Sequence, residues 1–165
     1  MSKKLDAKDL VDKIERLARE RMAEGQVVDL AALRQLKAQK AKPTVLVIED
    51  DETMRAALKR ILETDGIDVR TAADGTQLGA ALDNKMVDLI MLDIGLPWIN
   101  GFELAKLLKE HPVLKSIPLI FVSGHTSDAD VKQGFSVGAD DYIKKPFDVE
   151  KVRRAVQALL KLNKA

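Results

Sequence analysis

The chain has no cysteine, no large surplus of charge of either sign and no long apolar run. Without thiols it can form neither a disulfide nor a thiolate metal site, which fits a reducing compartment. The N-terminus lacks an apolar signal core, and no apolar run approaches the length of a membrane span. We therefore expect a cytoplasmic protein with no membrane partner.

Charge is almost balanced, with 27 Lys and Arg residues against 26 Asp and Glu residues and a net charge of +1. This balance gives no reason to expect a nucleic-acid or anionic-membrane partner. The 165 residues are 46% hydrophobic and 32% charged, a composition typical of soluble globular proteins. That length accommodates one domain with a substantial core and a modest appendage, and is too short for two full domains.

The chain divides at Pro43 into two parts that differ in charge and in pattern. Residues 1–43 hold 11 Lys and Arg against 7 Asp and Glu, a net charge of +4. Residues 44–165 hold 16 against 19, a net charge of −3. We expect an N-terminal helical extension over 1–43, one domain over 44–161 and a short tail over 162–165.

Within the N-terminal extension, apolar residues recur at helical spacing between Leu10 and Met22, and Gly25 is a typical helix stop. Asp29 can cap a second helix, whose leucines at 30, 33 and 36 share one stripe. Short helices of this kind are marginal in water unless the apolar stripe is buried. We predict a helical hairpin over residues 5–40 that pairs with a second copy of the chain as a homodimer. Docking on the domain and a floppy arm are the alternatives.

From Thr44 onward, apolar strand patterns alternate with helical ones. Strands are predicted at residues 45–48, 67–71, 89–92, 117–122 and 142–143. Helices are predicted at residues 52–64, from Asp74 through Leu82, from Phe102 through Leu108, after Ser127, and from Val149 through Leu160. Pro97 and Gly101 are expected to force a loop after the third strand. The alternation predicts a doubly wound, flavodoxin-like α/β fold whose five parallel strands take the order 2-1-3-4-5, with the polar second and fifth strands at the edges.

Acidic side chains follow two neighbouring strands of this predicted sheet. Glu49 and Asp50 come after the first strand and Asp93 after the third, so the strand order brings three carboxylates together. Carboxylates packed so closely repel one another and require a cation, and a ligand set of oxygen atoms alone favours Mg²⁺. Ser123 ends the fourth strand and Lys145 follows the fifth, so a hydroxyl and an ammonium face the same crevice. Both groups suit phosphoryl oxygens.

This ordered set, together with Lys145-Pro146, resembles the response-regulator receiver domain of two-component signalling over about residues 44–161. The resemblance implies that Asp93 accepts a phosphoryl group and that Tyr142, on the fifth strand, is the switch residue that reports it. It also implies that Glu49 and Asp50, together with Asp93, bind Mg²⁺. Ser123 and Lys145 are implied to contact the phosphoryl group, and Ser123 is also implied to take part in the switch.

Four further residues near the site have secondary or open roles. Among three consecutive acids, the resemblance selects the first two as metal ligands and leaves Asp51 to cap the following helix. Gly95 and His125 stand at two positions that vary widely in the family and affect how long the phosphoryl group lasts. Gly95 offers no side chain to the attacking water, whereas His125 can order or exclude it, so the lifetime stays open. Trp98 is either a partner contact or a packing residue.

The sequence therefore predicts a phosphorylation-dependent signalling switch. The expected phosphodonor is a histidine kinase, a phosphotransfer protein or a small molecule, and a downstream protein is expected to recognise the phosphorylated form. We expect no enzymatic turnover beyond the chain's own phosphorylation and dephosphorylation. Five residues follow Leu160, so we expect the output in a partner, in self-association or in residues 1–43.

Two functions of other classes are the alternatives. The first is a Mg²⁺-dependent phosphatase with an Asp nucleophile, a class that usually places a second Asp where this chain has Gly95. The second is a docking module that works without phosphorylation, although degenerate receivers usually lack the acceptor, the acids or the lysine. A DNA-binding regulator is not expected, because residues 1–43 contain no clear recognition helix.

Overall fold

The computed structural model describes residues 12, 16, 42–84 and 86–162. The predicted N-terminal hairpin, apart from two isolated positions, lies outside the described residues. The elements are β1 (Thr44–Ile48), α3 (Glu52–Thr64), β2 (Asp68–Ala72), α4 (Gly75–Asn84), β3 (Leu89–Leu92), α5 (Gly101–Glu110), a 3₁₀ turn (Leu114–Ser116), β4 (Leu119–Ser123), α6 (Asp128–Ser136), β5 (Asp141–Lys144) and α7 (Val149–Leu162). Within the described part of the chain, no helix combines the length and apolar character needed to cross a membrane.

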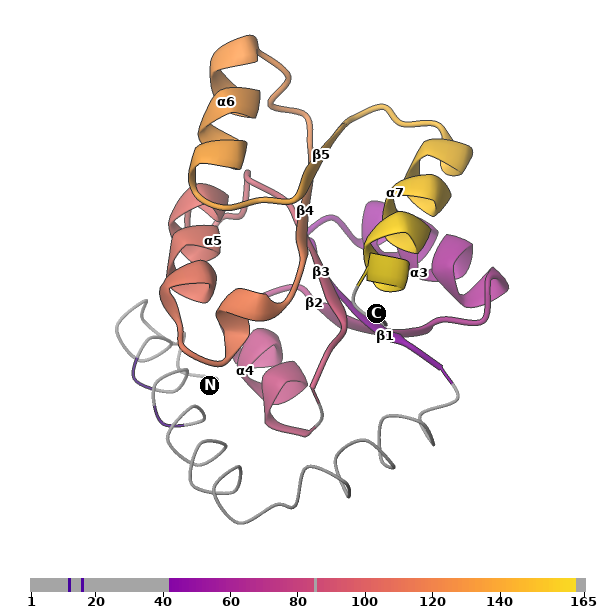
Figure 1. The fold of residues 1–165 in the computed structure, drawn as a ribbon, viewed down its shortest axis with the longest axis horizontal. Helices are drawn as coiled ribbons and strands as arrows, with labels where there is room; N and C mark the ends of the chain where they lie inside the picture. Colours follow the sequence, from indigo (N-terminus) through magenta and orange to yellow (C-terminus); the bar gives the residue numbers. More distant parts are fainter. Residues whose placement is uncertain (1–11, 13–15, 17–41, 85, 163–165) are drawn as a thin grey trace.

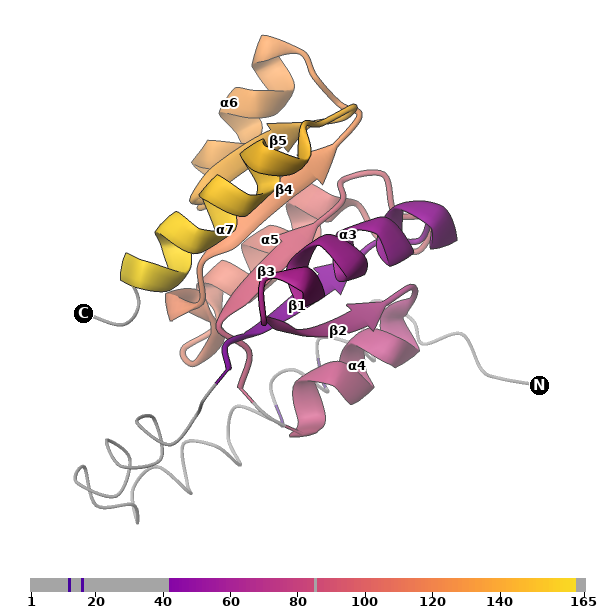
Figure 2. The same cartoon turned by 90° about the vertical axis from the view of Figure 1, so that its right-hand side faces the viewer.

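The five strands form one parallel sheet in the order β2-β1-β3-β4-β5, which confirms the predicted topology (Figure 2). The three central strands are fully buried, as their uninterrupted apolar runs indicated. β2 and β5 lie at the edges, where their polar residues are tolerated. The fold is therefore the predicted doubly wound α/β fold.

Helices cover both faces of the sheet (Figure 1). α4, α5 and α6 lie on one face, where they bury an apolar cluster that includes Leu78, Leu104 and Phe121. α3 and α7 lie on the other face, around a second cluster that includes Leu58 and Val156. Because both faces are covered, the working groups are left to the strand ends.

Four of the five predicted strand starts differ from the structure by one or two residues, and two of them, Ile67 and Ile117, are too early for the same reason. Ile67 and Ile117 are buried and apolar, but each donates its backbone N–H to the end of the preceding helical segment, to Leu62 at 3.2 Å and to Leu114 at 3.1 Å. Those N–H groups are therefore not available for the sheet ladder. β2 and β4 consequently begin later than predicted, and they run over Asp68–Ala72 and Leu119–Ser123 instead of 67–71 and 117–122. β1 begins one residue before the predicted 45–48, at Thr44, and β5 extends one residue beyond 142–143 at each end.

The helix caps predicted at Asp51 and Asp74 are confirmed, the cap predicted at Asp29 lies outside the described residues, and one predicted loop residue is corrected. Asp51 and Ser127 accept backbone N–H bonds at the starts of α3 and α6, and Asp74 does so at the start of α4. Gly101, which was expected to break the chain into a loop, is the first residue of α5, and Asn100 caps this helix. Its lack of a side chain serves close packing, because a Cβ there would lie 2.4 Å from Ile94 Cα.

Candidate functional site

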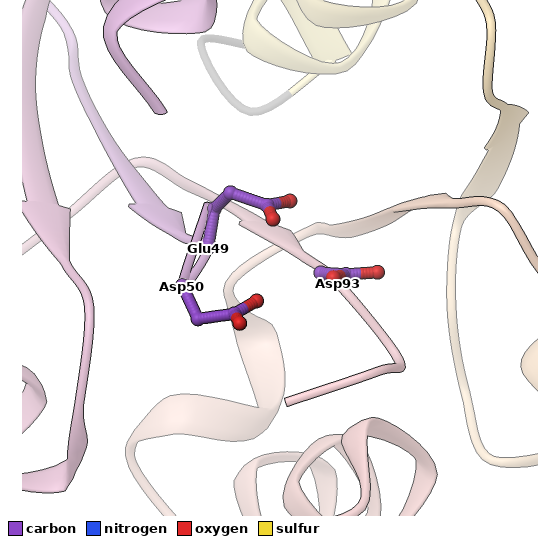
Figure 3. Close-up of side chains that lie close together, drawn as sticks. All are labelled: Glu49, Asp50 and Asp93. Atoms are coloured by element: carbon purple, nitrogen blue, oxygen red, sulfur yellow. The ribbon is translucent and has the colours of Figure 1, made fainter. Parts of the chain in front are cut away.

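The carboxylates of Glu49, Asp50 and Asp93 lie together at the carboxyl ends of β1 and β3. The parallel register pairs Ile48 with Leu92, so the residues that follow both strands emerge side by side. One carboxylate oxygen from each residue lies within 4.8 Å of the others. In Figure 3 the carboxylates of Glu49 and Asp50 extend toward the side of the site where Asp93 lies. Three oxygen donors this close are compatible with one small, hard cation such as Mg²⁺.

Lys145 supplies a positive charge to this acidic group from the neighbourhood of β5. Its Nζ donates to Glu49 Oε2 at 2.8 Å and lies 3.7 Å from Asp93 Oδ2. Glu49 is 2% exposed and Asp93 is 8% exposed. Among the described residues, Lys145 is the cation that pairs with this group, and it pairs with two of the three carboxylates, so the site without a metal carries excess negative charge in a partly buried place.

The pKa of the Glu49 carboxyl is shifted by its surroundings. Burial raises its pKa above the usual value, and the charge of Asp93 adds to the rise. The hydrogen bond and charge of Lys145, and a backbone hydrogen bond from Asp51, act in the opposite direction. Since the raised pKa means that the ionised form is disfavoured, a bound cation would stabilise this carboxylate.

Asp51 is not part of the acidic group. Its Oδ1 accepts a hydrogen bond from the Met54 backbone N–H at 2.7 Å, which is the helix cap predicted for it. Its own N–H donates to Glu49 Oε1 at 3.3 Å. The geometry therefore agrees with the selection of Glu49 and Asp50 as the acidic pair, and their role as metal ligands stays a prediction.

Ser123 and Tyr142 are connected to the site through the loop after β4. Ser123 is fully buried, and its Oγ accepts the His125 backbone N–H at 3.2 Å. The Tyr142 hydroxyl donates to the backbone oxygen of His125. Burial raises the pKa of Tyr142, as do the charges of Asp130 and Asp93, while a hydrogen bond with Ser123 opposes the rise. Both residues predicted to form the switch thus hold the same short loop.

Gly95 and His125 flank the acceptor on the exposed side of the site. A Cβ built on Gly95 would lie 3.7 Å from His125 Nε2 and 3.9 Å from Asp93 Oδ2. A side chain at position 95 would therefore contact both the imidazole and the Asp93 carboxylate. This places His125 beside the approach to Asp93, and its effect on phosphoryl lifetime stays a prediction.

Trp98, whose role the sequence left open, is a packing residue. It is half-buried against the core on the side of α4 and α5. A Cβ on Gly75 would contact its ring at 3.5 Å. The indole thus joins the loop after Asp93 to the start of α4.

Sequence reasoning missed two residues that support the site. Arg55 donates to the backbone oxygens of the acidic pair from one turn into α3, and no sequence signal distinguishes it from other helical arginines. Gly134 lies in the middle of α6, where a Cβ would come within 2.8 Å of Tyr142 Cδ2. A glycine inside a helix costs about 1 kcal/mol relative to alanine, so its presence was a usable signal of close packing.

Replacing Gly134 with alanine is expected to displace the Tyr142 ring. Because the methyl group overlaps that ring, the tyrosine must leave the site that now buries it. Since burial is the main cause of its raised pKa, the pKa of Tyr142 should fall toward the usual value. Tyr142 is the sole tyrosine, so its ionisation can be followed by ultraviolet absorbance. The titration midpoint should move to lower pH in Gly134→Ala and stay in place in Gln133→Ala, an exposed neighbour in the same helix; an unchanged curve in both contradicts the expectation.

Comparisons with known proteins agree with this geometry. The response regulator receiver domain family matches residues 45–157. A putative response regulator from Chloroflexus aurantiacus has 30% identity and a TM-score of 0.68 over 73% of this chain and 98% of its own. The chemotaxis protein CheY4 of Vibrio cholerae has 29% identity and a TM-score of 0.67 over 72% of this chain and 99% of its own.

Curated relatives are longer than the matched region. The DNA-binding dual master transcriptional regulator RpaA of Synechocystis is 39% identical over 119 residues, which are 72% of this chain and 49% of that protein. The phosphate regulon transcriptional regulatory protein PhoB of Rhizobium meliloti is 32% identical over 72% of this chain and 52% of its own. The chain thus spans about half the length of these relatives, and the expectation of no nucleic-acid partner finds no support in them. Residues 45–157 make this chain a member of the response regulator receiver domain family, whose role is phosphorylation-dependent signalling.

Proposed function

We propose that the chain is switched by a phosphoryl group on Asp93, with Mg²⁺ held by Glu49, Asp50 and Asp93. The observation that carries this proposal is the position of Lys145, whose ammonium lies 2.8 Å from Glu49 and 3.7 Å from Asp93. A cation held next to a partly buried carboxylate suits the charge that builds up when phosphate oxygens enter the site. When bound, Mg²⁺ would neutralise further charge on those oxygens.

The chain's own residues divide the reaction between them. An Asp93 oxygen forms a bond to phosphorus while the bond from phosphorus to the donor's leaving group breaks. Lys145 stays charged and donates to a phosphoryl oxygen, and Ser123 offers its hydroxyl to another. These roles require positioning and charge, and no other side chain forms a covalent bond. The expected donor is a histidine kinase, the partner class of receiver domains, or a phosphotransfer protein or small phosphodonor.

The signal can leave the site through the loop after β4. The Ser123 hydroxyl that would turn to the phosphoryl group now accepts the His125 N–H. Tyr142 holds the carbonyl of the same His125. A change at Asp93 therefore alters two hydrogen bonds that connect the loop to β4 and β5, and a protein partner would recognise the result.

We propose that the chemistry is confined to the chain's own phosphorylation and dephosphorylation. Gly95, two residues after the acceptor, has no carboxyl group to serve as the second acid of a phosphatase. Self-association through residues 5–40 stays a prediction, since that segment lies outside the described residues.

Intact-mass measurement after incubation with acetyl phosphate tests the proposal. In the presence of Mg²⁺ the chain is expected to gain the mass of one phosphoryl group, and hydroxylamine, which cleaves acyl phosphates, should remove it. With EDTA in place of Mg²⁺ the gain should be lost. A chain that stays unmodified under both conditions would favour the docking module, and multiple turnover of a phosphomonoester would favour the phosphatase.

A further inference from the structure

Arg55 contacts three consecutive backbone carbonyls in the turn between β1 and α3. Its Nη1 donates to the carbonyl oxygens of Glu49 at 3.0 Å and Asp50 at 3.2 Å. Its backbone N–H donates to the carbonyl oxygen of Asp51 at 2.9 Å. The last of these is the ordinary first-turn bond of α3, which any non-proline residue at position 55 would make. The guanidinium itself therefore holds the carbonyls of Glu49 and Asp50, the acidic pair.

Among the described residues, two further hydrogen bonds hold the backbone of Glu49 to Asp51. The Glu49 backbone N–H donates to the Ala72 carbonyl at 3.1 Å, and the Asp51 N–H donates to the Glu49 side chain. Asp50 is exposed, so packing alone does not orient its carboxylate. The Glu49 carboxylate is also held by burial and by the hydrogen bond from Lys145 Nζ. The direction of the exposed Asp50 carboxylate therefore depends most on how the backbone is held, and Arg55 holds it.

The guanidinium does not act as a counter-ion for the site. Although three carboxylates lie nearby, Arg55 makes no ion pair within the part of the chain that the structure describes. In that part of the chain, Lys145 is the cation that pairs directly with the carboxylates of Glu49 and Asp93. What Arg55 contacts is the backbone.

We propose that Arg55 is a positioning residue for the Mg²⁺ site, which it serves by fixing the turn that presents Glu49 and Asp50. The inference rests on the proposed function, because it concerns the metal that phosphorylation of Asp93 requires. The positioning role and the charge of Arg55 predict opposite effects of its removal on Mg²⁺ affinity. If only charge mattered, removal of Arg55 would raise the Mg²⁺ affinity, because a fixed positive charge repels the cation. If Arg55 positions the metal ligands, its removal lowers that affinity.

The test compares Arg55→Met with Arg60→Met in the full chain. Both variants remove one arginine charge from α3 and keep an unbranched, helix-favouring side chain, but Arg60 is exposed and contacts none of these carbonyls. Affinity is obtained from the rise of the thermal unfolding midpoint with MgCl₂ concentration, and the metal-free midpoint reports the fold. Arg55→Met is expected to bind Mg²⁺ about 10-fold more weakly than wild type, the usual effect of losing an outer-shell partner of a metal site. Arg60→Met is expected to bind as wild type does or slightly more tightly.

Each outcome decides one question. Binding by Arg55→Met that equals or exceeds that of Arg60→Met overturns the positioning role while leaving the proposed function intact. A wild-type chain whose midpoint does not respond to Mg²⁺ overturns the proposed function, and the inference with it. If Arg55→Met does not fold, Arg55→Lys is measured in its place, because it keeps the charge and loses the planar guanidinium. Weaker binding by that variant supports the inference, and undiminished binding overturns it.

Discussion

The Asp93→Asn variant is expected to gain no phosphoryl mass from acetyl phosphate with Mg²⁺, under conditions in which the wild type is labelled. An amide oxygen is a poor nucleophile, and an amide contributes no charge to the cation site. The replacement has nearly the same volume, so the buried position at the end of β3 stays filled. The loss should therefore be complete and should not arise from unfolding.

The same variant should affect the neighbouring charges in a defined direction. The Asp93 charge helps to raise the pKa of Glu49, so its removal should lower that pKa. The metal-free protein should be stabilised by up to about 1 kcal/mol, because one of three mutually repelling carboxylates is gone. Thermal unfolding with and without Mg²⁺ should show a higher metal-free midpoint and a smaller response to the metal.

Asp51→Asn is the matched control for Asp93→Asn. It makes the same chemical change three residues from the end of β1, and asparagine caps helices as well as aspartate does. Labelling and Mg²⁺ response should both remain close to wild type. Labelling of Asp93→Asn at the wild-type level would place the acceptor elsewhere, and loss of labelling in Asp51→Asn would show that the acidic pair has been misassigned.

The acidic group could be predicted because its geometry follows from topology. Uninterrupted apolar runs marked the central strands, and polar residues marked the edges, so the strand order placed Glu49 and Asp93 on adjacent strand ends. In a parallel sheet all carboxyl ends meet at one edge, and no knowledge of side-chain packing is needed to bring these residues together.

Other parts of the site could not be predicted, because they depend on close packing between segments. Ile67 and Ile117 read as strand residues by hydrophobicity, yet their N–H groups close the preceding turns. Arg55 resembles any solvated helical arginine until the path of its side chain is known. Gly134 was an anomaly inside a helix whose cause, the Tyr142 ring, lies on another element. The sequence pattern predicts which helices and strands form, whereas the roles of their individual residues depend on tertiary contacts.

Gly101→Ala should be the most destabilising single methyl addition near the site. The new Cβ would lie 2.4 Å from Ile94 Cα and 2.5 Å from the Asp93 carbonyl oxygen, and both contacts are with backbone. A clash with a flexible side chain is relieved by rotation, whereas here the start of α5 must move away from the end of β3. That movement would strain the hydrogen bond from Gly101 N–H to the Ile94 carbonyl, now 2.9 Å long.

We expect Gly101→Ala to lower the free energy of unfolding by about 3 kcal/mol, at the upper end for overpacking, and the unfolding midpoint by about 10 °C. Gly124→Ala is the control, since a Cβ there meets nothing within 4 Å and the residue lies in the loop after β4. Its effect should stay within about 1 kcal/mol and can be stabilising, because alanine restricts the unfolded chain.

Because the displaced backbone includes the carbonyl of the acceptor itself, Gly101→Ala should also slow labelling of Asp93 at temperatures where the variant is fully folded. A midpoint equal to that of Gly124→Ala would mean that α5 can retract from β3 at little cost, and that the packing of Gly101 does not position Asp93.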